Sequence, residues 1–268
     1  MVKGRVPMAI LMVVLTLLCC LLGPLPRLVF LLLCGLAATW ETWSILLDRR
    51  HPAYYGTLLL GFVLVCGALS FLRTALIWYG VAFFAAAQLL LALGALTYRE
   101  GQGKDALSAL TVLVYPASFF GALLCISQTD RWLWPFSAGV LTAWICDSAA
   151  LMVGKKWGKH RLKTPVSPHK TVEGCLAGAV AALPTGLLCY ALFRGDCPLS
   201  AGGWMLLSLI VSSWGQVGDL GASLVKRSVG AKDFSTLLGP HGGVMDKYDS
   251  MVFSIPLAYL CLKIAGVM

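Results

Sequence analysis

The sequence predicts an all-α integral membrane protein that crosses the bilayer about nine times, with its N-terminus in the cytosol. Hydrophobic residues make up 59% of the 268 positions and charged residues only 12%. A soluble domain has about 25% charged residues, so this composition does not suit a chain surrounded by water. Apolar stretches of about 20 residues, the length that a helix needs to cross the hydrocarbon core, recur along the chain. Because lipid offers no partner for backbone polar groups, these stretches are expected to be helices.

Charged residues, glycines and prolines divide the chain into nine apolar segments. The expected helices cover residues 7–23, 27–47, 54–72, 74–97, 106–128, 132–154, 171–193, 201–225 and 249–267. The first of them follows Lys3 and Arg5, but Gly23-Pro24-Leu25-Pro26 leads directly into the next apolar run, without a small-residue cleavage site. We therefore interpret this segment as a retained helix rather than a cleaved signal peptide.

The positive charges support this topology independently. With a cytosolic N-terminus and nine helices, 16 of the 21 lysines and arginines fall on the cytosolic side. Such an excess is typical of cytosolic loops. The net charge of +9 then reflects topology, and no nucleic-acid partner is expected. The ten cysteines lie mostly in apolar runs without CxxC spacing, so we interpret them as small hydrophobic residues rather than metal ligands or disulfides.

Carboxylates inside the expected helices point to a functional site. Asp147 and Asp219 each lie seven residues before the cytosolic end of their helix. That spacing places both about 10 Å below the membrane surface. Such residues cost on the order of 3 kcal/mol and are usually functional, although two helix–helix hydrogen bonds are the alternative. Asp246 and Asp249, three residues apart, share one helical face at the start of the last helix.

Two basic cytosolic loops, 155–170 and 226–248, accompany these acids. Acids and cations at one membrane face suit a polyanion that arrives with a divalent metal ion, and hard oxygen ligands favour Mg²⁺. A patch for lipid headgroups is the alternative for the cations. Gly239-Pro240-His241-Gly242-Gly243 could turn backbone N–H groups toward an anion. Thr171 could help to bind phosphate or could simply cap the helix that follows.

The motifs resemble one known family. Ser223-Leu224-Val225-Lys226-Arg227, then Lys232-Asp233, then the run from Leu238 to Asp249 resembles the hallmark of the phosphatidate cytidylyltransferases, or CDP-diacylglycerol synthases. Gly218-Asp219-Leu220, Asp147-Ser148 and the run from Ser167 to Gly174 also resemble that family's motifs. The resemblance covers roughly residues 140–260, whereas the first five helices match only in being apolar.

This resemblance implies a reaction and an organisation. The reaction would join CTP and phosphatidate to give CDP-diacylglycerol and pyrophosphate, in phospholipid biosynthesis. The resemblance also implies a homodimer in the bacterial cell (inner) membrane, in contact with its lipids. The charge pattern predicts that the active site faces the cytosol. Residues 1–130 would form a supporting or dimer region of five helices, and residues 131–268 the catalytic region.

The resemblance and the charge pattern together assign roles to particular residues. The expected catalytic residues are Asp219, Asp246, Lys226 and Arg227. The expected Mg²⁺ ligands are Asp219, Asp246, Asp249 and Asp147, and a second, monovalent cation is left open. The expected substrate- and phosphate-binding residues are Ser167, Lys170, Thr171, Ser223, Lys232, His241, Gly242, Gly243 and Lys247.

Three positions depart from the family pattern. Lys247 stands where the family usually has arginine, Tyr248 replaces an aliphatic residue, and Ala222 replaces an acid. A lysine cannot hold phosphate bidentately, so the role of the family's arginine does not carry over directly to position 247. We expect activity to survive, with an altered preference for substrate or metal as one consequence.

Two other kinds of protein remain as alternatives. One is a CTP-dependent enzyme that acts on another lipid, such as a polyprenol kinase or an archaeol-type cytidylyltransferase. The other is a transporter, since intramembrane acids also bind ions. A transporter would show two matching sequence halves, but the polar residues here gather in the C-terminal half.

Overall fold

A computed structural model describes residues 22–47, 108, 111–112, 115–116, 118–164, 166–239 and 242–268. The described part of the chain contains seven helices and no strand; its only β-type pairing is an isolated bridge between Arg161 and Thr171. The predicted all-α membrane class is confirmed. The expected helices 54–72 and 74–97, almost all of 7–23 and seven of the 23 residues of 106–128 lie outside the described residues.

The helix bounds follow the apolar segments closely. The helices are α2 (Pro24–Leu46), α6 (Ser118–Ser127), α7 (Leu133–Trp157), α8 (Val172–Phe193), α9 (Ala201–Ser228), α10 (Met245–Tyr248) and α11 (Met251–Ile264). Of these, α2, α7 and α8 are long and apolar enough to cross a membrane, and α11 contains a shorter apolar helix, Phe253–Ile264. The expected segments 27–47, 132–154 and 171–193 correspond to the first three.

The chain divides into two compact units. The first comprises residues 1–129 together with 229–246, and the second comprises residues 130–228 together with 247–268. In the first unit, α2 packs against α6, and the buried Arg27 donates a hydrogen bond from Nη2 to the carbonyl oxygen of Ser127 at 2.7 Å. The predicted roles of residues 1–130 and 131–268 stay predictions.

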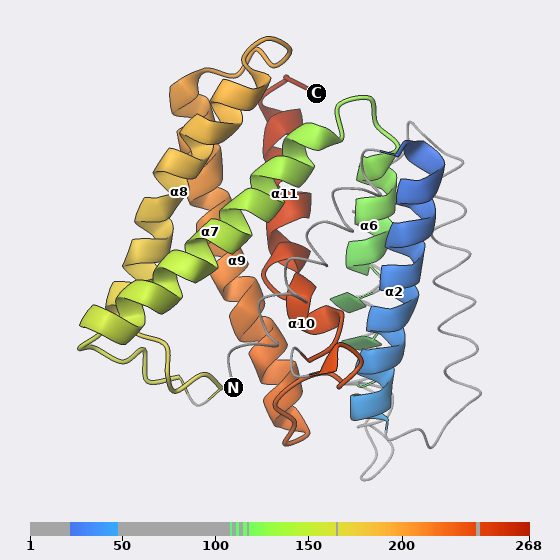
Figure 1. Cartoon of the computed structure of the whole chain (residues 1–268), viewed down its shortest axis with the longest axis vertical. Coiled ribbons are helices and arrows are strands. Elements are labelled where there is room, and N and C mark those ends of the chain that lie inside the picture. The colour runs from blue at the N-terminus through green and yellow to red at the C-terminus, as the bar shows by residue number, and fades with distance from the viewer. Residues whose placement is uncertain are drawn as a thin grey trace, which may run out of the picture. The chain divides into compact units, whose positions relative to one another are not determined.

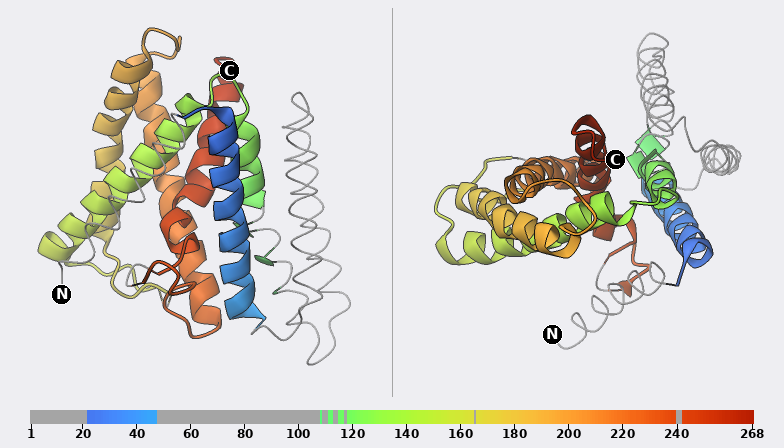
Figure 2. Two further views of the ribbon diagram at one scale, coloured as in Figure 1. Left: turned by 45° about the vertical axis from the view of Figure 1, so that its right-hand side comes forward. Right: turned by 90° about the horizontal axis from the view of Figure 1, so that it is seen from above.

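The second unit is a bundle in which α7 packs against α8, α9 and α11, and α9 packs against α8 and α11 (Figures 1 and 2). Its core gathers around the fully buried Trp204 and Val211 of α9. The outer faces of α8 and α9 instead expose large apolar side chains, among them Leu176, Val180 and Leu206. An apolar core combined with apolar exposed faces is what a helix bundle surrounded by lipid requires.

Glycines allow the helices of the second unit to approach closely. A Cβ atom at Gly186 of α8 would lie 2.5 Å from the carbonyl oxygen of Trp204 and 2.6 Å from the Cα atom of Met205. Small residues at helix–helix contacts are typical of membrane bundles, where close van der Waals contact replaces the hydrophobic effect as the driving force.

Substitution of Gly186 by alanine should therefore destabilise the bundle. The clash is with backbone atoms of α9, so the two helices must separate, and we expect the free energy of unfolding to fall by about 1–3 kcal/mol. Thermal unfolding in detergent would measure the loss. The control is Gly202→Ala in the first turn of α9, where a Cβ atom meets nothing within 4 Å. Equal stability of the two variants would contradict the close-contact explanation.

Candidate active site

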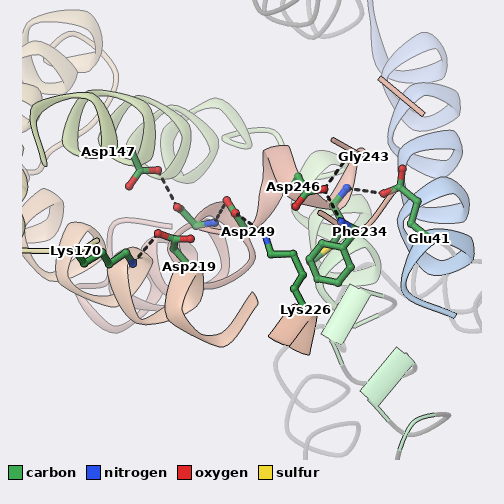
Figure 3. A network of polar contacts seen from close by, with 11 residues as sticks. Glu41, Asp147, Lys170, Asp219, Lys226, Phe234, Gly243, Asp246 and Asp249 are labelled. Atoms are coloured by element: carbon green, nitrogen blue, oxygen red, sulfur yellow. Dashed lines mark hydrogen bonds and ion pairs between the residues drawn. The ribbon is translucent and has the colours of Figure 1, made fainter. Parts of the chain in front are cut away.

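Three aspartates and two lysines lie close together in the second unit (Figure 3). Asp147 is on α7, Asp219 is on α9, and Asp249 is in the two-residue link between α10 and α11. The ammonium group of Lys170 lies 2.6 Å from Oδ2 of Asp219, and that of Lys226 lies 4.0 Å from Oδ2 of Asp249. Two ion pairs thus join motif residues that are distant in the sequence.

The geometry of α9 explains part of this arrangement. Asp219 and Lys226 are seven residues apart, which is about two helical turns, so both side chains lie on one face of the helix. Ser223 lies between them on the same face by this spacing, and Arg227 is exposed in the last turn. The helix therefore presents an acid near its middle and cations at its C-terminal end, where positive charge is also favoured by the helix dipole.

The link between α10 and α11 contains Asp249, a carboxyl group whose pKa is raised by its surroundings. Burial raises the pKa of Asp249, the neighbouring acid Asp219 raises it further, and Lys226 lowers it. The carboxylates of the second unit thus repel one another, and positive charge relieves that repulsion. Lys170 and Lys226 supply such charge here.

Asp147 has a specific partner as well. Its Oδ2 atom accepts a hydrogen bond from Oγ of Ser250 at 2.8 Å, which ties α7 to the residue that directly follows Asp249. Asp147 therefore has a structural contact, although with the link and not with another helix. Its role as a metal ligand stays a prediction.

The loop between α7 and α8 is ordered by hydrogen bonds at its end. The backbone N–H of Leu162 donates to the carbonyl of Lys170 at 2.9 Å, and that of Val172 donates to the carbonyl of His160 at 2.8 Å. Oγ1 of Thr171 accepts from the N–H of Gly174 at 3.1 Å and caps α8. The structure therefore shows the capping role of Thr171, while its contact with phosphate, like that of Ser167, stays a prediction.

The signature residues from Lys232 to Asp246 belong to the first unit, in which Asp246 holds a tight turn, whereas Lys247 belongs to the second. Its Oδ2 atom accepts hydrogen bonds from the N–H groups of Phe234 at 2.8 Å and Gly243 at 2.9 Å. Gly242 has φ of 80°, a left-handed conformation that favours glycine. We call residues 242–246 the Asp246 turn.

Protein acceptors take up the N–H groups of the two glycines in this turn. The N–H of Gly242 donates to the carbonyl of Gly239 at 3.3 Å, and that of Gly243 donates to Asp246. The turn would need to rearrange before these groups could bind an anion, so the phosphate contacts of Gly242 and Gly243 stay predictions. His241 lies outside the described residues. Lys232 is exposed and Lys247 is half-buried.

A further acid, Glu41 of α2, was missed by the sequence reasoning. Its side chain is fully buried, and its carboxylate accepts hydrogen bonds from Oγ of Ser235 at 2.7 Å and from the N–H groups of Val244 and Met245 at 2.9 Å each. Glu41 lies six residues before the end of the expected helix 27–47. Its depth below the cytosolic surface is close to that expected for Asp147 and Asp219, so the same spacing rule applies to it.

Alanine at Gly243 should disturb the Asp246 turn. A Cβ atom there would lie 2.5 Å from the carboxylate of Glu41, so either Glu41 or the turn must move. We expect amide hydrogen exchange at Val244 and Met245 to rise about tenfold as their hydrogen bonds to Glu41 weaken. Gly195→Ala, in an open loop with nothing within 4 Å, is the control. Unchanged exchange in Gly243→Ala would contradict the assignment.

The type of side chain in the second unit suits Mg²⁺, which prefers carboxylate oxygens together with substrate phosphates. Asp219 and Asp249 offer such oxygens, and each already attracts an ammonium group. Among the residues that the structure describes, no three Asp, Glu, His or Cys side chains form a ready metal-binding group. The side chains therefore fit a Mg²⁺ ion that is bound by one or two carboxylates and by the phosphates of the substrate.

The fold and the two ion pairs define a helical membrane protein in which lysines pair with acids of the sequence motifs. Residues 3–265 match the model of the cytidylyltransferase family, so the chain belongs to that family. A phosphatidate cytidylyltransferase of Aquifex aeolicus is 37% identical over 166 residues, which cover 62% of this chain and 60% of the relative.

Staphylococcal relatives show the same level of similarity. The phosphatidate cytidylyltransferase of Staphylococcus haemolyticus is 38% identical over 122 residues, and that of Staphylococcus aureus strain COL is 39% identical over 126 residues. Each of these two alignments covers 46% of both proteins. The chain thus spans about half the length of the curated relatives that it matches.

Proposed function

We propose that this protein is a phosphatidate cytidylyltransferase, which transfers CMP from CTP to phosphatidate and releases pyrophosphate. The observation that carries the proposal is the pairing of Lys170 with Asp219 and of Lys226 with Asp249. All four residues belong to motifs that resemble the family's. Family membership and the names of the relatives support the same reaction.

The chemistry requires charge neutralisation more than proton transfer. A phosphate monoester has a second pKa near 6, so the phosphate of phosphatidate is mostly ionised at neutral pH and needs no general base. One of its oxygens forms a bond to the α-phosphorus of CTP, while the bond from that phosphorus to the bridging oxygen breaks and pyrophosphate leaves. The obstacle is the approach of two anions and the charge that develops on the leaving group.

The lysines and arginine of the motifs could neutralise the negative charge of the two substrates. Lys170, Lys226, Arg227 and Lys232 would bind the triphosphate and the lipid phosphate. Lys170 contacts Asp219 in the structure, so it would exchange this carboxylate for a substrate phosphate. Asp219 and Asp246 would hold Mg²⁺, with Asp249 and Asp147 as further ligands or as their supports. Bound Mg²⁺ would supply neutralisation of the phosphate charge.

The membrane setting fits a lipid substrate. The positive-inside pattern supports an active site at the cytosolic face, where CTP is available, and the bacterial relatives support the bacterial cell (inner) membrane. The headgroup of phosphatidate would enter sideways while its acyl chains stay in lipid. We also propose a homodimer, on the basis of the family resemblance.

An assay of purified protein in detergent tests this function. We expect labelled CTP and Mg²⁺ to give CDP-diacylglycerol with phosphatidate as the acceptor, no product after EDTA treatment, and recovery on addition of Mg²⁺. The panel should also include a polyprenol and an archaeol-type lipid phosphate. Product with only one of those acceptors, or no product with any lipid, would contradict the proposal.

A further inference from the structure

The carboxylate of Glu41 accepts its hydrogen bonds from uncharged donors. Ser235 Oγ and the N–H of Val244 donate to Oε1, and the N–H of Met245 donates to Oε2. A carboxylate only accepts hydrogen bonds, so it matches three converging donors, and bonds to an ionised acceptor are about twice as strong as neutral ones. The cost of a fully buried acid in an apolar helix is thereby offset by contacts to one short segment.

Glu41 and Asp246 divide the donors of this segment between them. Glu41 accepts from the N–H groups of Val244 and Met245, and Asp246 accepts from those of Gly243 and Phe234. Four N–H groups at and around the Asp246 turn therefore depend on two carboxylates. Glu41 holds the residue directly before Asp246, so it limits where the Asp246 backbone can lie.

The glycine at position 243 is a consequence of the same contact. A Cβ atom there would lie 2.5 Å from the Cδ, Oε1 and Oε2 atoms of Glu41. The carboxylate thus occupies the space that a side chain at position 243 would need. The second glycine of the His-Gly-Gly motif is therefore explained by a residue of the N-terminal half of the chain.

We propose that Glu41 is a positioning residue, which fixes the Asp246 turn so that the Asp246 carboxylate is held in place for the metal-bound substrate. This proposal rests on the proposed function. It gives a helix outside the motif-bearing region a direct part in holding a signature aspartate of the first unit.

Hydrogen exchange and kinetics of Glu41→Gln test the proposal. The amide of glutamine keeps one acceptor oxygen but places an NH₂ group against an N–H donor. We expect exchange in peptides covering Val244 and Met245 to rise at least about tenfold, while peptides from α7, α8 and α9 stay unchanged. The turnover number should fall about tenfold to a hundredfold, and the Mg²⁺ concentration for half-maximal rate should rise.

Two further variants complete the series. Ser235→Ala removes one of the three donors without placing a new group against the carboxylate, so a smaller change in the same direction is expected even if Glu41→Gln does not fold. Thr42→Val is the matched control, because the buried Thr42 hydroxyl donates to the carbonyl of Ala38 within α2.

The results separate this proposal from the proposed function. If wild-type protein makes no CDP-diacylglycerol, the proposed function fails. Unchanged exchange at Val244 and Met245 in both Glu41→Gln and Ser235→Ala would overturn the positioning role. So would a lower turnover number with an unmoved Mg²⁺ dependence, since that pattern indicates only a loss of folded enzyme.

Discussion

Asp246→Asn is expected to lower CMP transfer about a hundredfold to a thousandfold while leaving the protein folded. The asparagine carbonyl oxygen can still accept hydrogen bonds from the N–H groups of Phe234 and Gly243, as Oδ2 of Asp246 does now. The substitution therefore keeps the turn and removes the negative charge. Conversion of labelled CTP into lipid product by membranes that contain the variant would measure the effect.

Two comparisons make this result specific to the charge. Asp246→Ala removes both the charge and the hydrogen bonds, so it should also raise amide exchange in the turn, which Asp246→Asn should not. Asp196→Asn, an exposed acid in the loop after α8, is the control and should retain wild-type activity. Wild-type rates in Asp246→Asn membranes would show that Asp246 does not hold the metal ion.

Asp219→Asn is the second substitution with a large expected effect, again about a hundredfold to a thousandfold in CMP transfer. Asp219 is paired with Lys170 at 2.6 Å, so two explanations of the loss must be separated. Asp219 either binds the metal ion during the reaction or only balances the charge of Lys170. The rates of Asp219→Asn, Lys170→Met and the double variant would distinguish them.

The double variant decides between these explanations. If Asp219 only balances the charge of Lys170, removal of both partners should recover much of the activity, because no half-buried charge is left unpaired. We expect no recovery, since each residue has its own role with metal ion or phosphate. A double variant that is more active than Asp219→Asn would contradict the metal role of Asp219.

The sequence alone predicted most of the fold that the structure describes. Long apolar segments ended by charges, glycine or proline are sufficient to locate helices, because the bilayer forbids other backbone structure. The deviations lie at helix ends. Helix α7 continues to Trp157 and α9 to Ser228, beyond the predicted 154 and 225, since lysine and arginine are favourable in a last turn. Helix α11 begins at Met251, after Asp249 and Ser250 form a link.

The sequence also predicted acids and cations that the structure brings close together in the second unit, because polar residues are rare and costly in such a chain. It predicted Asp147 and Asp219 from their depth, and the motif spacing pointed to Lys170, Lys226 and Asp249. It missed Glu41, although the depth rule applies equally to it. No motif includes this residue, and in sequence terms it is one acid in an apolar helix.

Only the tertiary structure decided which of these groups are partners. Asp219 could have paired with any nearby lysine, and the contact with Lys170 depends on how α8 packs against α9. Glu41 and Met245 lie 204 residues apart, and no local pattern relates them. Side-chain periodicity determines the face on which a residue lies, whereas its partner is determined by helix packing, which brings distant parts of the chain together.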